Sequence, residues 1–139
     1  MKKPLETVIR TDADLCDFWE TTVAAGGFGR RSIWMIFLDS IGRVLPTIIP
    51  IDDVSARPDR RLIEGMSEIV GGLLGDNGVA SVALMLARPG PATMTDYDRH
   101  WARSLQNVPC GDRRWPIHLG TADRAQVFGP DDLIVSRAA

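Results

Sequence analysis

Asp98 is the acidic side chain whose position most suggests chemistry. The segment Thr95-x-x-Asp98 predicts the start of a helix, with the threonine hydroxyl as the cap and the carboxylate in the electropositive first turn. At 100° per residue, Asp98 falls on the same helix face as apolar neighbours. A carboxylate on such a face needs a hydrogen-bond donor or must be neutralised, so we expect any functional site to lie here. The apolar neighbours are Trp101, Ala102 and Leu105.

The other groups that could bind a metal or act as nucleophiles are few and scattered. The chain has two histidines, His100 and His118, and two cysteines, Cys16 and Cys110, which form no C-x-x-C motif. A zinc site needs three or four ligands at defined spacings. Asp98, Cys110 and His118 could be drawn as one set, whereas His100 lies two residues from Asp98 and points away on a helix. We predict no metal site and no cofactor.

The residues before Asp98 predict the strand that would position it. Residues 79–87 are almost all apolar, which is typical of a strand buried on both faces of a partly parallel sheet. The run Arg88-Pro-Gly-Pro then ends the strand, because proline offers no ladder donor. Residues 33–38 predict a second buried strand, and residues 43–51 its antiparallel partner. Pro46 and Pro50 place that partner at a sheet edge.

The remaining pattern predicts helices on the sheet and a hairpin near the end. A capping box at Thr11-x-x-Asp14 begins one amphipathic helix. Residues 60–74 carry a 3.6-residue apolar stripe that includes Met66 and Ile69. The glycine-rich stretch 26–29 follows a helix and precedes a strand, the reverse of a phosphate loop, so we interpret it as a turn. The later predicted strands are 115–119, 125–128 and 133–135.

The strand, the Pro/Gly loop and the Thr95-x-x-Asp98 helix together resemble the JAB/MPN metalloprotease-like domain, nearest its bacterial RadC-like branch. The resemblance covers residues 30–135 and implies an α/β fold of the cytidine-deaminase-like, three-layer kind. In that fold a mixed, twisted sheet of five or six strands is flanked by helices. The family carries His-x-His-Pro at the strand end, seven residues before Ser-x-x-Asp. Those two histidine positions fall on Met85 and Ala87.

The chain departs from the family at the residues that perform its chemistry. Both histidines are replaced, and no glutamate stands on the return strand between Val44 and Ile51 to act as a base. The branch's Asp-His-Leu reads Ile-His118-Leu here. The resemblance therefore implies a domain without catalytic residues, leaning away from an enzyme. Its vestigial cleft would be lined by Met85, Ala87, Arg88, Thr95, Asp98 and His118, with Arg88 neutralising Asp98 in place of a metal.

Composition supports one domain, 1–139, with residues 1–29 as an N-terminal segment and helix. A net charge of −2 argues against nucleic acid, and no apolar run is long enough to cross a membrane. We expect a cytoplasmic, bacterial protein-interaction or assembly module that forms a homodimer, with adjacent Phe18 and Trp19 suited to a partner. Two alternatives stay open: a protein that binds a small ligand or nucleotide derivative in the vestigial cleft, and a hydrolase with a different site.

Overall fold

A computed structural model describes residues 7–24, 29–76, 78–122 and 124–133 of the chain. In these residues it shows an α/β protein with a five-stranded mixed sheet and four helices. None of the described helices is long and apolar enough to span a membrane. The elements, in chain order, are α1 (Asp12–Ala24), β1 (Ser32–Leu38), β2 (Val44–Asp52), α2 (Arg60–Leu73), β3 (Ser81–Ala87), α3 (Asp96–Leu105), β4 (His118–Gly120), β5 (Ala125–Val127) and α4 (Pro130–Leu133).

Strand β3 lies in the interior of the sheet, as predicted. The strand order is β2-β1-β3-β4-β5, and only the β3–β4 pair is parallel. All seven residues of β3 are buried, because neighbouring strands flank it and packed side chains cover both of its faces. Parallel β3 and β4 are joined through α3, and the Pro/Gly loop at 88–95 connects the carboxyl end of β3 to the start of this helix.

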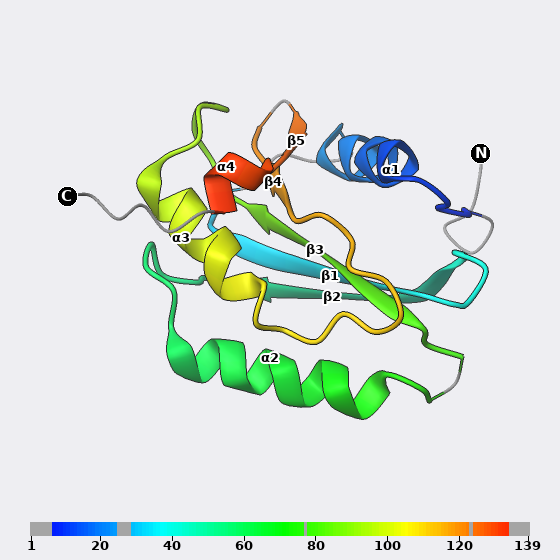
Figure 1. Ribbon diagram of the computed structural model, residues 1–139. Helices are drawn as coiled ribbons and strands as arrows, with labels where there is room; N and C mark the ends of the chain where they lie inside the picture. Colours follow the sequence, from blue (N-terminus) through cyan, green and yellow to red (C-terminus); the bar gives the residue numbers. More distant parts are fainter. Residues whose placement is uncertain (1–6, 25–28, 77, 123, 134–139) are drawn as a thin grey trace.

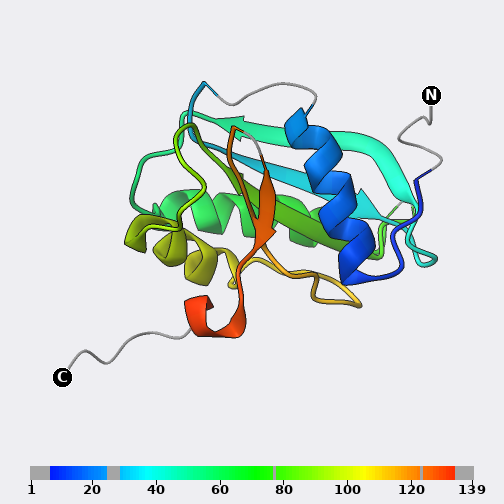
Figure 2. The same cartoon turned by 90° about the horizontal axis from the view of Figure 1, so that it is seen from above.

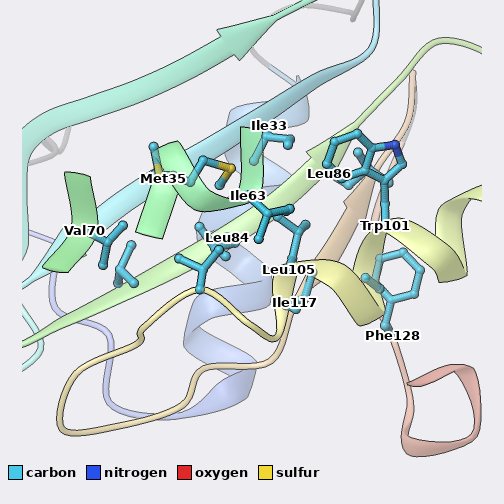
Figure 3. Close-up of a cluster of buried hydrophobic side chains, with 14 of the residues drawn as sticks. Ile33, Met35, Ile63, Val70, Leu84, Leu86, Trp101, Leu105, Ile117 and Phe128 are labelled. Atoms are coloured by element: carbon cyan, nitrogen blue, oxygen red, sulfur yellow. The ribbon is translucent and has the colours of Figure 1, made fainter. Parts of the chain in front are cut away.

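The helices form layers on the two faces of the sheet (Figure 1). Helix α1 covers one face, and seen from above it crosses the strands obliquely (Figure 2). Helices α2 and α3 cover the other face. Each face has its own apolar cluster, because side chains alternate along a strand. Figure 3 shows the α2/α3 cluster, in which Trp101 of α3 lies beside Leu86 of β3. The α1 cluster is centred on Leu15, Trp19 and Met85.

Strand β2 is an edge strand, as its two prolines predict. Pro50 pairs with Trp34 of β1 and offers no N–H to the ladder, so proline is tolerated on this strand as it would not be in the sheet interior. The pairing of β1 with β2 shifts register between Ile36 and Leu38, close to the turn that joins the two strands. The start of α1 is also confirmed: Asp14 N donates to Thr11 Oγ1 (3.0 Å) and Thr11 N donates to Asp14 Oδ2 (3.2 Å).

Four sequence predictions differ from the structure. Leu133 ends the short helix α4 and does not begin a strand, because Gly129 N donates to Asp132 Oδ2 and Pro130 begins the helical turn. The strand predicted from residue 115 begins only at His118. Ile69 of the α2 stripe is 47% exposed. Trp19 is fully buried within its own chain, so it offers no surface to a partner.

Three predicted features lie outside the described residues: most of the turn at 26–29, the part of the last strand beyond Leu133, and the start of the N-terminal segment. Within the described part of that segment, Val8 forms a single bridge with Arg43.

Candidate functional site

Arg88 and Asp98 form a buried, bidentate ion pair where β3 ends and α3 begins. Arg88 Nε donates to Asp98 Oδ1 and Arg88 Nη2 donates to Asp98 Oδ2, each at 2.8 Å. Arg88 is 5% exposed and Asp98 is fully buried. Two parallel charge-assisted hydrogen bonds fix both side chains in one geometry. The predicted pairing of Asp98 with Arg88 is therefore confirmed.

The remaining donors of Arg88 hold the Pro/Gly loop around its guanidinium. Nη1 donates to Pro89 O (3.1 Å) and Pro91 O (2.8 Å), and Nη2 also donates to Thr93 O (3.0 Å). A buried guanidinium must fill its donors, and three carbonyls of the loop accept from it here. One side chain thus joins the end of β3, the loop and α3.

Thr95 completes the arrangement as the cap of α3. Its hydroxyl accepts from Asp98 N (3.2 Å), and its own N–H donates to Asp98 Oδ2 (2.9 Å). This reciprocal capping box is the one the sequence predicts. Asp98 therefore serves both as a capping residue and as the partner of Arg88, and three hydrogen bonds converge on its two oxygens.

The ionised form of Asp98 is stabilised at this position. Burial by itself raises the pKa of the carboxyl group, but hydrogen bonds from Arg88 and the Thr95 amide, together with the charge of Arg88, outweigh it. The net effect lowers the pKa below its ordinary value. A general acid or base working near neutral pH needs the opposite shift, so this carboxylate is set up for an ion pair and not for proton transfer.

The structure divides the six predicted cleft residues between the two faces of the sheet. Met85 and Ala87 belong to the α1 cluster, and His118 is the register partner of Met85 on β4. Arg88, Thr95 and Asp98 lie together at the start of α3, which packs on the opposite face. The reason is alternation along β3: Arg88 follows the direction of Leu86, whereas Ala87 follows that of Met85. The six residues therefore do not line one cleft.

His118 is a buried histidine with a backbone partner. Its Nδ1 lies 3.2 Å from Pro116 O, to which it donates. Burial lowers the pKa of the imidazole, which keeps it neutral at physiological pH. Within the described residues, no group of three His, Cys, Asp or Glu side chains could hold a metal ion.

A hollow of about 350 Å³ lies at the opposite end of β3 from the ion pair. Its wall includes the β1–β2 turn at Asp39–Gly42 and the indole of Trp115, whose Nε1 donates to Ser81 Oγ (2.9 Å). The guanidinium of Arg113 lies 3.6 Å above the Trp115 ring and also donates to Asp12 (3.0 Å). Sequence reasoning missed this hollow, because its residues come from four distant segments and share no motif.

Comparisons with protein-family models, with curated proteins and with solved structures found no match for this chain.

Proposed function

We propose that this chain is a non-catalytic protein-interaction or assembly module of the JAB/MPN-like type, in which a buried ion pair takes the place of a metal centre. The observation that carries the proposal is the pair of hydrogen bonds by which Arg88 occupies both carboxylate oxygens of Asp98. The carboxylate that a metal site would use is bound by a guanidinium and an amide. At the two positions where the resembled family carries histidines, Met85 offers only a soft thioether and Ala87 offers no ligand atom, and both lie on the other face.

Electrostatics supports the same proposal. A divalent cation beside Asp98 would stand within a few ångströms of the Arg88 guanidinium in a buried environment, where like charges repel strongly. Binding the metal would require Arg88 to leave, which would release the three loop carbonyls that it holds. Without these contacts the loop would lose the hydrogen bonds that hold it to the end of β3. The site favours the ion pair over the metal.

Turnover measurements test the proposal directly. The full chain is incubated with peptide and isopeptide-linked substrates, with and without added Zn²⁺. We expect hydrolysis no faster than with the Asp98→Asn variant, because no general base or metal ligand set surrounds the carboxylate. Zinc-dependent turnover that Asp98→Asn abolishes would contradict the proposal.

The second candidate function is small-ligand binding, and the hollow beside Trp115 favours it. This hollow is lined by both polar and apolar groups, and its wall includes exposed Ile41 and the buried Ser81 hydroxyl. Its position differs from that of the predicted cleft. NMR titration with candidate ligands tests this second function. We expect a ligand to shift the indole N–H resonance of Trp115 and to leave that of buried Trp101 unchanged. No shift at Trp115 would indicate a purely structural hollow.

A further inference from the structure

Strand β2 forms one edge of the sheet, and its outer side has the composition of a strand that could pair further. Among the described residues, β2 pairs with β1 on its inner side, and on the outer side Val8 bridges Arg43 just before the strand begins. Figure 2 shows β2 as the outermost strand on its side of the sheet. Its sequence, VLPTIIPID, is rich in β-branched and apolar residues and has one charged residue, Asp52. Such an edge is a ready template for another strand.

The two prolines of β2 stand where the backbone faces this outer side. An antiparallel bridge between Trp34 and Pro50 can form only through the hydrogen bonds of the residues on either side, because Pro50 has no N–H. The backbone of Pro50 therefore faces away from β1. The N–H of Val44 also faces away, since it donates to Thr7 O (2.9 Å). Alternation along the strand gives Pro46 the same direction.

This alternation continues through the register shift near the start of β2. Val44 and Ile48 pack in the α1 cluster, whereas Leu45 and Ile49 pack against the α2/α3 cluster. The even-numbered residues of β2 therefore direct their backbone groups outward. Prolines occupy two of these positions, and the N-terminal segment already accepts from a third, that of Val44. Within β2, the outward N–H groups that are left belong to Ile48 and Asp52.

We infer that Pro46 and Pro50 close the outer edge of β2 to a further strand, so that any assembly of this chain uses another surface. The strand best matched to this edge is β2 of a second copy. A two-fold axis at Ile48 would place Pro46 of each copy opposite Pro50 of the other. Neither proline can donate, so these positions would form no ladder hydrogen bonds, and the central Ile48 pair alone would keep both of its bonds. The inference goes beyond the proposed function, because it holds whether or not the chain assembles.

Restoring the missing N–H groups tests the inference by sedimentation velocity on the full chain. We expect a double variant, Pro46→Val with Pro50→Val, to form larger species at concentrations at least about tenfold below those at which the wild type does, because each new N–H adds a ladder hydrogen bond. Thr47→Val is the matched control. Thr47 is exposed on the same strand but its backbone faces β1, so this substitution adds apolar surface and no outward N–H. We expect the control to sediment like the wild type, and melting temperatures confirm that the variants fold.

Amide hydrogen exchange followed by NMR supplies an independent readout. In the wild type, we expect slow exchange at the N–H of Ile49, which faces β1, and fast exchange at the N–H of Ile48, which faces outward. In the double variant, the Ile48 amide should become protected as the new ladder forms. Slow exchange at Ile48 in the wild type would overturn the inference, as would unchanged sedimentation of the double variant or an equal effect of Thr47→Val. These outcomes leave the proposed function standing, because its tests are zinc-dependent turnover and zinc content.

Discussion

Replacing Asp98 by alanine is expected to lower the free energy of unfolding by about 3–5 kcal/mol. The substitution leaves the buried Arg88 guanidinium without its counter-ion, and it removes the capping-box hydrogen bond from Thr95 N to the carboxylate. The other capping-box bond, from the backbone N–H of residue 98 to Thr95 Oγ1, is kept. An unpaired buried charge accounts for most of this loss, because the Coulombic partner goes while the desolvation remains. Urea unfolding followed by circular dichroism measures the effect.

The matched control is Asp96→Ala, which removes another carboxylate from the first turn of α3. Asp96 is fully exposed and lies 3.5 Å from Arg99 Nη1, so we expect a loss of no more than about 0.5–1 kcal/mol. If Asp98→Ala lowered the free energy of unfolding by no more than Asp96→Ala does, the structural role of the ion pair would be contradicted.

The pH dependence of stability gives a second readout of Asp98. Its pKa is lowered in the folded protein, so the unfolded chain takes up this proton first as the pH falls. The contribution of Asp98 to stability is complete above its unfolded pKa of about 3.9 and is lost as the pH falls through the folded pKa. Stability of the wild-type chain should therefore fall below about pH 4. Asp98→Ala should lose less stability over the same acid range.

Replacing Gly111 by alanine is expected to destabilise the protein by about 2–5 kcal/mol. Gly111 has a φ of +87°, and a Cβ there would lie 2.1 Å from Ala80 O and 2.9 Å from Leu74 Cδ2. The backbone next to that carbonyl oxygen cannot move easily, because Gly111 forms a bridge with Ser81 at the start of β3. Left-handed backbone strain and the overlap act together, and thermal unfolding measures their sum.

Gly75→Ala separates these two effects. Gly75 has the same φ of +87°, but an added Cβ would meet nothing within 4 Å. Only the left-handed conformation is then disfavoured, so we expect a loss of about 1–2 kcal/mol. Equal losses at Gly75 and Gly111 would show that the close approach to Ala80 does not matter.

The sequence predicted the parts of the fold that local chemistry determines. The continuous apolar run of β3 requires burial on both faces, and the capping box at Thr95 determines where α3 begins, so both were confirmed. The pairing of Arg88 with Asp98 also followed, because a carboxylate on an apolar helix face needs a donor close in sequence. These predictions depend on short segments, in which propensity and pattern point to the same structure.

The predictions that failed depended on contacts between distant segments. The six residues assigned to one cleft lie on two faces, because alternation along β3 separates Met85 and Ala87 from Arg88 and α3 packs on the face of Arg88. Trp19 was expected at the surface, but β4 and β5 pack against α1 and help to bury it. Ile69 fits the apolar period of α2 but lies at the shoulder of its packed face. Periodicity identifies an apolar stripe and leaves its width undetermined.

The most direct test of the proposed function is the zinc content of the full chain, measured by elemental analysis after purification from unsupplemented medium and after incubation with Zn²⁺. The ion pair between Arg88 and Asp98 predicts far less than one zinc per chain in both samples, and no difference between the wild type and Asp98→Asn. One zinc per chain in the wild type that is lost in Asp98→Asn would show that the carboxylate binds a metal, and the non-catalytic proposal would then be wrong.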